Sequence, residues 1–328
     1  MAFANANISD VLATTIESRT RKLADNVSSN NALLGRLKKK GKQKTFSGGH
    51  KILQELTFAE NSNAGYYSGY DLLPVGVSDV ISAAEYNIKQ AAVAVTISGL
   101  EMLQNSGREK MIDLMEGRLG VAEKTMQNLL SAGIYSDGTG AGGKEIDGLQ
   151  KALPIDPTAA PYGGIDGNVF TFWQNAVVND ANATTIEASM NLLWSQLVRG
   201  SDRPDLIPCD SVYWNAYLQV LQNNQRFTNT NEADNGFMSI KFMDADVVLD
   251  GGIYTGDITG ATGAPVGTAF FLNCDYIHYR PHRDRNLVAL SPGKRVSVNQ
   301  DAEVQLIGWA GNLTTSGRMM QGRHDINA

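Results

Sequence analysis

A long amphipathic segment in the first half of the chain constrains the fold more than any other feature of the sequence. Between Glu109 and Ala132, apolar residues recur at intervals of three and four, and charged residues fall between them. The apolar stripe consists of Met111, Met115, Leu119, Ala122, Met126, Leu129 and Leu130. The spacing predicts a helix about 36 Å long at a rise of about 1.5 Å per residue. The glycine-rich segment 131–143 ends this helix.

Two strand-like segments precede the helix and predict a long β-hairpin. Residues 50–58 and 79–98 are rich in β-branched and alternating positions, and the turn-rich segment 61–75 separates them. A two-stranded hairpin buries too little apolar surface to be stable alone in water. The hairpin therefore needs a surface to lie on, and a neighbouring subunit is the natural candidate.

Three tyrosines mark the tip of the predicted hairpin. Tyr66, Tyr67 and Tyr70 lie within YYSGYDLLP, in a connection much longer than the roughly two to five residues of an ordinary hairpin turn. Tyrosine buries a large ring and keeps a polar end, so such a cluster either packs locally or anchors a partner. We take the three tyrosines as candidate subunit-interface residues.

A basic run lies ahead of the hairpin. The nine residues Arg36–Lys44 include six lysines and arginines, and we expect them to form an exposed, mobile arm. Such a run is either a solvated face or a contact to nucleic acid or to an acidic partner surface. Lys38, Lys39 and Lys40 at its centre are the candidate interface residues under the second interpretation. The preceding segment 8–27 has helical spacing and predicts a first helix.

The remainder of the chain mixes both kinds of secondary structure. Residues 185–199 and 211–222 are expected to form helices, and residues 246–249 and 269–279 are expected to form strands. Residues 294–313 alternate again and should add strands that return to the long helix. The sequence therefore predicts the α+β class.

Composition narrows the possible functions. With 42% hydrophobic and 19% charged residues, the chain is expected to fold. Its net charge of −6 does not suit a protein that grips nucleic acid over its whole surface, so any DNA contact should be local and weak. The N-terminal sequence lacks a signal-peptide pattern, and no apolar run reaches membrane-spanning length. These features favour cytoplasmic synthesis.

Cys209 and Cys274 are expected to be buried, reduced thiols rather than a disulfide.

One motif resembles a phosphate-binding loop. Residues 138–145, GTGAGGKE, match GxxxxGK, but Glu145 replaces the hydroxyl residue that should hold Mg²⁺. A phosphate loop follows a strand and opens a helix, whereas this segment closes a helix. A flexible inter-domain loop is therefore the better interpretation.

The sequence predicts no metal or catalytic site. His278 and His282 would share one face of a helix, but Pro281 lies between them and the preceding residues are strand-like. The aspartates at positions 244, 246 and 250 lack the spacing of a calcium loop, and we expect them to be solvated strand positions. The chain contains no recognisable arrangement of a nucleophile, a histidine and an acid.

The order of these parts resembles the Hong Kong 97-like fold of tailed-bacteriophage major capsid proteins. That order is a helical arm, a basic run, a long hairpin, a long helix, a glycine break, a mixed domain and returning strands. Three stretches are also similar to that family: YSGYDLLPVGVSDVISAAEYNIKQ, LVRGSDRPDLIPCDSVYWNAYLQVLQ and GWAGNLTTSGR. The likeness covers nearly the whole chain.

The resemblance implies a division of the chain and a function. Residues 1–45 would be the N-terminal arm and 46–99 the hairpin called the E-loop. Residues 100–144 with 290–328 would form a peripheral domain holding the spine helix, and 145–289 an axial domain around the capsomer centre. The implied function is self-assembly into hexamers and pentamers that tile an icosahedral shell around the phage genome, with no enzyme activity and no cofactor.

The resemblance also implies partners and a location. The chain would be part of the virion, and its partners would be other copies of itself, the portal, a decoration protein and packaged DNA in weak, non-specific contact, with no membrane. Only about 45 residues precede the hairpin, so we expect a separate scaffolding protein rather than a fused one. No self-crosslinking pair of lysine and asparagine is identifiable.

Three other functions remain as alternatives. An encapsulin-like compartment would share the fold but enclose cargo proteins. A nucleotide-dependent enzyme would use the loop 138–145. A surface adhesin would use the strands, although the absence of a signal peptide argues against it.

Overall fold

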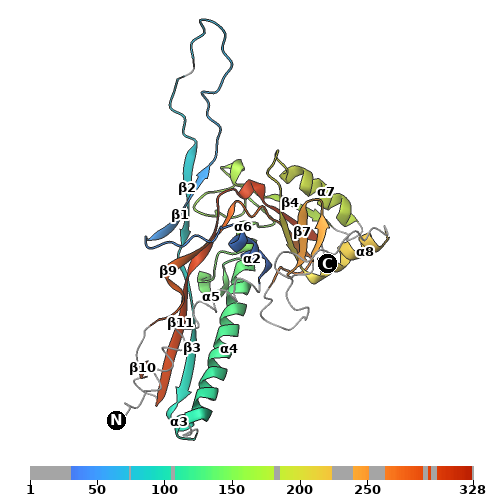
Figure 1. Ribbon diagram of the computed structural model, residues 1–328. Coiled ribbons are helices and arrows are strands. Elements are labelled where there is room, and N and C mark those ends of the chain that lie inside the picture. Colours follow the sequence, from blue (N-terminus) through green and yellow to red (C-terminus); the bar gives the residue numbers. More distant parts are fainter. Residues whose placement is uncertain are drawn as a thin grey trace.

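Helices and strands are mixed in an extended molecule with a projecting hairpin and a lateral domain (Figure 1). The computed structural model describes residues 31–73, 75–104, 108–180, 185–223, 239–250, 263–290, 295–296 and 301–326. The predicted α+β class is confirmed. The helix predicted at 8–27 lies outside the described residues. No helix in the described ranges is both long and apolar enough to cross a membrane.

The predicted long helix is present as α4 (Arg108–Tyr135), which follows the short helix α3 (Gly99–Gln104). Its 28 residues span about 42 Å. Four residues of the predicted stripe are buried: Leu119, Ala122, Met126 and Leu130. Leu129, at the edge of the predicted stripe, is 47% exposed. The side chains of Met111 and Met115 lie outside the described part of the structure.

A long antiparallel sheet lies against α4. Its central strand β11 (Ala302–Thr315) pairs with β3 (Lys89–Ser98) along one edge and with β9 (Ile277–Ala289) along the other. The short β10 (Arg295–Val296) pairs with the beginning of β11. β3 packs on α4. The C-terminal strand β11, which the alternation at 294–313 predicts, pairs with β3.

The predicted hairpin is also present. β1 (Lys51–Thr57) and β2 (Ile81–Asn87) pair antiparallel, and residues 58–80 connect them. Four alternating residues of the pair form its buried face: Ile52, Leu56, Ala84 and Tyr86. The second predicted arm, 79–98, is divided at Ile88, because the residues beyond it pair with β11 instead. One face of the β1–β2 pair therefore packs on the rest of the subunit, and the loop 58–80 projects beyond it (Figure 1).

The lateral domain is built on a six-stranded sheet. In spatial order its strands are β4 (Ala176–Asp180), β12 (Gly322–Ile326), β8 (Thr268–Phe271), β5 (Leu206–Cys209), β7 (Ala245–Leu249) and β6 (Ser239–Phe242). The helices of this domain are α7 (Ile186–Leu197) and α8 (Ser211–Asn223). Both predicted helices are confirmed to within two residues. The strand predicted at 269–279 is two strands, because residues 272–276 turn the chain from one sheet into the other.

Short helices complete the described fold. They are α2 (Ala32–Lys39), α5 (Gly140–Gly143), α6 (Leu149–Ala152) and the 3₁₀ turns η1 (Thr171–Trp173) and η3 (Arg318–Met320).

The apolar core has two parts. One lies beneath α4, the long sheet and the hairpin base, and includes Trp173 and Trp309. The other joins α7 and α8 to the six-stranded sheet. β9 lies in the long sheet, and β12, which follows it in the chain, lies in the six-stranded sheet. The chain therefore passes between the two sheets more than once.

Candidate assembly surfaces

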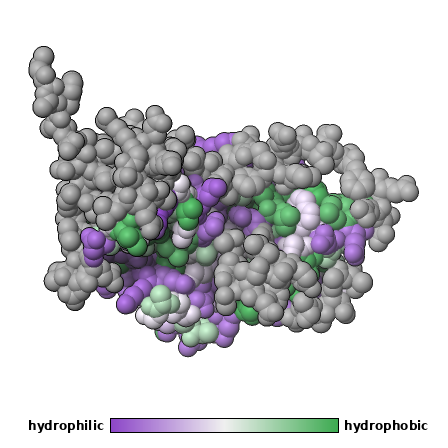
Figure 2. Space-filling view, turned by 90° about the horizontal axis from the view of Figure 1, so that it is seen from below, coloured by the Kyte–Doolittle hydropathy of each residue, from purple (hydrophilic) through white to green (hydrophobic). Residues whose placement is uncertain are grey.

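The tip, residues 58–80, exposes a concentration of apolar side chains. Tyr66 and Tyr70 are fully exposed and Tyr67 is two-thirds exposed. The tip's other large exposed apolar residues are Leu72, Leu73, Val75 and Val77. On the face seen in Figure 2, by contrast, small groups of hydrophobic residues are interspersed with hydrophilic ones in the coloured part of the surface. A local concentration of exposed, large apolar side chains is typical of interaction sites.

Polar contacts within the tip hold its two sides together. The Asn63 amide nitrogen Nδ2 donates to the Gly76 carbonyl at 2.7 Å, and the Ser62 backbone N–H donates to Ser78 Oγ at 3.3 Å. Near the end, the Ser68 N–H donates to Asp71 Oδ2 at 2.9 Å. These bonds give the tip a shape without burying its tyrosines.

The basic run does not form the predicted exposed arm. Within α2, Leu33, Leu34 and Leu37 are fully buried, and this face holds the helix against the core. The Asn31 side chain caps the helix by accepting a hydrogen bond from the Leu34 N–H at 3.1 Å. The run is therefore anchored, because the apolar residues interleaved with its cations are buried.

Aspartates of the same chain supply the acidic partners. Arg36 Nη2 lies 2.6 Å from Asp246 Oδ2. Lys40 Nζ lies 3.0 Å from Asp205 Oδ2 and 2.9 Å from Asp275 Oδ2. These carboxylates outweigh the effect of burial, so the pKa of both Arg36 and Lys40 is raised. Lys38 and Lys39 are exposed on the surface. Of the three candidate lysines, Lys40 is therefore the one that anchors α2 to the rest of the subunit.

This division predicts unequal effects of charge reversal. We expect Lys40→Glu to destabilise the subunit by about 1–3 kcal/mol, because a carboxylate would then lie beside Asp205 and Asp275. The double variant Lys38→Glu/Lys39→Glu should change stability by less than about 0.5 kcal/mol, as exposed substitutions usually do. The unfolding midpoints of the unsubstituted protein, Lys40→Glu and the double variant, measured by thermal unfolding, give the difference in stability. Equal midpoints for all three would contradict the anchoring role of Lys40.

The prediction that the aspartates at 244–250 are solvated is wrong for two of the three. Asp246 pairs with Arg36, and Asp250 Oδ2 accepts a hydrogen bond from the Tyr135 hydroxyl at 2.6 Å. Burial raises the pKa of Asp250. Asp244 is exposed and pairs with Arg203. The partners are distant in sequence, so local spacing carries no signal for these contacts.

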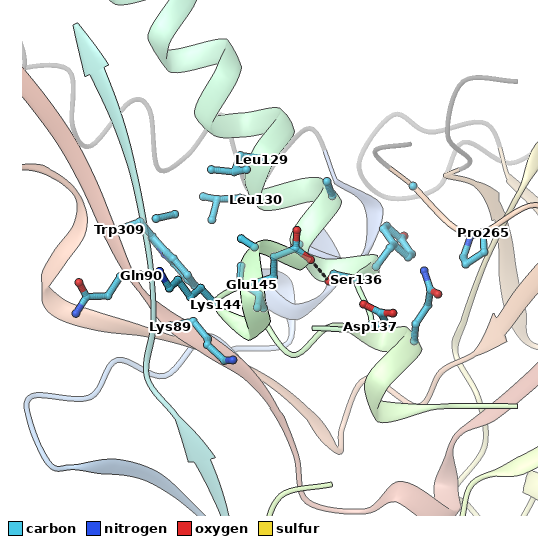
Figure 3. Close-up of a pocket in the computed structure, with 18 residues that line it drawn as sticks. Lys89, Gln90, Leu129, Leu130, Ser136, Asp137, Lys144, Glu145, Pro265 and Trp309 are labelled. Atoms are coloured by element: carbon cyan, nitrogen blue, oxygen red, sulfur yellow. Dashed lines mark hydrogen bonds between the residues drawn. The ribbon is translucent and has the colours of Figure 1, made fainter. Parts of the chain in front are cut away.

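The glycine-rich loop forms one wall of a cavity of about 730 Å³. Figure 3 shows Leu129 and Leu130 of α4, Trp309 of β11 and Lys89 of β3 around it. Glu145 Oε2 accepts a hydrogen bond from Ser136 Oγ at 2.6 Å, and Lys89 Nζ donates to the Gly143 carbonyl at 2.5 Å.

This geometry argues against a phosphate-binding loop. The loop follows a helix, as the sequence indicates. A Cβ placed on Gly140 would lie 2.2 Å from Glu145 Oε1, so the Glu145 carboxylate fills the space beside the loop backbone. A carboxylate at that position would repel a triphosphate.

His278 and His282 lie on a strand, and Cys209 and Cys274 are buried, as the sequence predicts. His278 and His282 lie on the strand β9, where residues four apart are separated by about 13 Å, too far to share a metal ion. Among the described residues, no group of three or more His, Cys, Asp or Glu is placed to hold a metal. Cys209 and Cys274 are both buried and form no disulfide, and burial raises the pKa of both thiols.

His278 should make stability depend on pH. Burial, together with the charges of Lys42, Lys44 and Arg280, lowers its pKa from 6.5 to about 4. The folded state therefore binds the proton less tightly than the unfolded state. The resulting stabilisation is present above pH 6.5 and is lost as the pH falls towards 4.

We expect His278→Gln to flatten the fall of the unfolding midpoint between pH 6.5 and 4. Part of the slope should remain, because burial also lowers the pKa of His324. Thermal unfolding at several pH values, compared with the unsubstituted protein, measures this effect. Identical pH profiles would contradict it.

Solved structures with the same fold are capsid and compartment shells. The chain is similar to a subunit of the Cyanophage A-1(L) capsid asymmetric unit, with a TM-score of 0.65 and 15% identity over 88% of this chain and 89% of that one. It is similar to a subunit of the capsid of the native GTA particle, with a TM-score of 0.57 and 9% identity over 88% and 89%. The encapsulin of Synechococcus elongatus PCC 7942 matches with a TM-score of 0.51 and 10% identity over 86% and 84%.

Sequence comparison adds no nearer relative. No protein-family model matches the chain. No curated protein matches it either. The structural likeness extends over nearly nine-tenths of both chains despite this divergence in sequence. The chain therefore has the Hong Kong 97-like fold of tailed-phage capsid subunits.

Proposed function

We propose that this chain is the major capsid protein of a tailed bacteriophage and that its copies assemble into an icosahedral head shell. The observation that carries the proposal is the exposed apolar tip at 58–80, in a chain whose fold matches capsid subunits over 88% of its length. Exposed apolar side chains of this kind are typically buried against a partner. In a shell, that partner is the neighbouring subunit.

The parts of the fold acquire roles under this proposal. The β1–β2 hairpin and its tip act as the E-loop, and α4 acts as the spine helix of the peripheral domain. The anchored segment 31–46 is the end of the N-terminal arm, and the six-stranded sheet with α7 and α8 forms the axial domain at the capsomer centre. Repeated contacts of moderate strength, related by symmetry, then close the particle.

Shell function implies further partners. Hexamers and pentamers of this chain would enclose the phage genome, and a portal would occupy one vertex. A separate scaffolding protein would guide assembly, and a decoration protein would bind the outer surface. The net charge of −6 suits a lining that packaged DNA contacts weakly. The chain would be located in the virion and would catalyse no reaction.

An encapsulin-like compartment is the second candidate, because an encapsulin matches the chain over 86% of its length. The two functions differ in what the particle encloses. Particles purified from a native source should contain DNA if the chain is a phage capsid protein. Cargo protein without DNA would establish the compartment instead.

Sedimentation tests whether the chain assembles. We expect the purified protein to sediment as capsomers or shells at high micromolar concentration, because the apolar side chains of the tip are exposed in the single chain. A compact monomer under those conditions would contradict the proposed function.

A further inference from the structure

A cluster of cations lies at the base of the hairpin. Residues 42–46 run parallel to β9: the Lys44 N–H donates to the Tyr279 carbonyl, and the Tyr279 N–H donates to the Lys42 carbonyl, both at 3.1 Å. The pairing continues to Phe46, whose carbonyl accepts from the Arg283 N–H at 2.9 Å. This added edge strand places Lys42 and Lys44 beside Arg280.

Arg280 is the most unusual member of the cluster. It is half-buried, and its Nη1 donates to Gln54 Oε1 of β1 at 3.1 Å. Its Nε is buried without a hydrogen-bond partner, and among the described residues no carboxylate forms an ion pair with it. Burial alone therefore lowers the pKa of Arg280, whereas Asp205 and Asp246 raise that of Arg36.

His278 adds a second unsatisfied group. Its side chain is 94% buried, since only 6% is exposed, and its Nδ1 has no hydrogen-bond partner in the described structure. The charges of Lys42, Lys44 and Arg280 all act on it, and Asp275, which lies 3.6 Å from Lys42, opposes them. A buried polar atom without a partner is unfavourable. The cluster Lys42, Lys44, His278 and Arg280 is thus suited to an anion that the single chain does not provide.

The tip carries the complementary charge. Residues 58–80 contain three acidic residues, Glu60, Asp71 and Asp79, and no lysine or arginine. All three are exposed. Arg280 of the cationic cluster contacts β1 at Gln54, in the middle of that strand, and the loop 58–80 projects beyond β1 and β2 (Figure 1). A tip carboxylate at this cluster must therefore come from another molecule.

A carboxylate fits the cluster better than the backbone of a nucleic acid. Phosphate tracking needs an extended positive field, whereas Asp275 already neutralises part of this cluster. The guanidinium group of arginine forms strong, charge-assisted hydrogen bonds with a carboxylate. A tip-to-base contact joins two different surfaces, and such head-to-tail contacts close into rings when the rotation permits.

We propose that the cationic cluster of one copy binds the tip carboxylates of a second copy. The inference rests on the proposed function, since it requires copies of the chain to associate. It assigns the tip two modes of contact, with the tyrosines burying apolar area and the carboxylates fixing the register on the neighbour. Docking should also ease protonation of His278, because the incoming anion offsets the cations around it.

Zero-length cross-linking between differently labelled copies tests the contact. Equal amounts of ¹⁴N- and ¹⁵N-labelled protein are mixed before assembly and treated with a carbodiimide, which joins an amine to a neighbouring carboxylate. We expect mixed-isotope peptides that join Lys42 or Lys44 to Glu60, Asp71 or Asp79. The same-isotope link between Lys42 and Asp275 serves as an internal control for reagent access.

Variants sharpen the test. Arg280→Gln should lower the yield of mixed-isotope links at least fivefold. The matched control is Arg203→Gln, which removes an exposed arginine that pairs with Asp244 and should leave the yield unchanged. Replacing the three tip acids by their amides should abolish the links.

Three results would overturn the inference. Shells without these links would refute the contact and leave the proposed function standing. Failure of the copies to associate would refute both. Protection of Lys42 and Lys44 by added DNA, without tip links, would assign the cluster to nucleic acid.

Discussion

Replacement of Tyr66, Tyr67 and Tyr70 together by serine is expected to stop closed shells from forming while the subunit stays folded. Tyrosines at the centre of an interface often contribute about 2 kcal/mol or more each. Losing three at every tip would weaken each contact by several orders of magnitude. The fold should not change, because these rings are exposed and lie far from the core beneath α4.

The measurement is paired. Circular dichroism reports the fold, and electron microscopy reports the particles. The variant with phenylalanine at all three positions is the matched control, and it should still assemble because the rings are kept. Normal shells from the serine variant would refute the role of the tip as an anchor. Loss of helical signal would show that the tyrosines belong to the subunit's own core.

Gly148→Ala is expected to destabilise the subunit strongly. A Cβ at this position would lie 2.5 Å from the carbonyl oxygens of Gly133 and Ile134 and 2.6 Å from the Ser136 nitrogen. These are backbone atoms at the end of α4, so they cannot move aside without displacing the helix. We expect a cost of about 3 kcal/mol or more, at the upper end of overpacking effects.

Gly117→Ala is the matched control within the same region. A Cβ there meets nothing within 4 Å, and the residue lies in α4. Alanine in a helix is more stable than glycine by roughly 0.5–1 kcal/mol, so this variant should unfold at a slightly higher temperature. Thermal unfolding and soluble yield compare the two. A Gly148→Ala protein as stable as the unsubstituted chain would contradict the close approach of residue 148 to α4.

Elements with local patterns could be predicted from the sequence. The period of the stripe around Met126 is that of a helix, and α4 exceeds its predicted bounds by one residue at the start and three at the end. The alternating pattern of residues 50–58 and 79–98 predicted the hairpin. It did not predict the break at Ile88, because the residues on both sides of Ile88 are extended. Only the change of pairing partner from β1 to β11 separates β2 from β3.

Features that depend on distant partners could not be predicted. The six cations of the run 36–44 have the same local signature whether they are solvated or paired, and Asp205 and Asp275 lie more than 160 residues away in sequence. The crossing of β12 into the six-stranded sheet depends on its pairing with β4 and β8. In the sequence, Arg280 and His278 have the pattern of ordinary strand residues. Their role in a cationic cluster depends on the edge strand 42–46, which pairs with β9 only in the folded chain.

Three-dimensional electron microscopy of assembled particles tests the central claim most directly. The proposed function predicts closed icosahedral shells in which residues 58–80 of each subunit lie on a neighbouring subunit, with Tyr66, Tyr67 and Tyr70 buried in the contact. Isolated monomers, or particles whose tips remain uncovered, would contradict it.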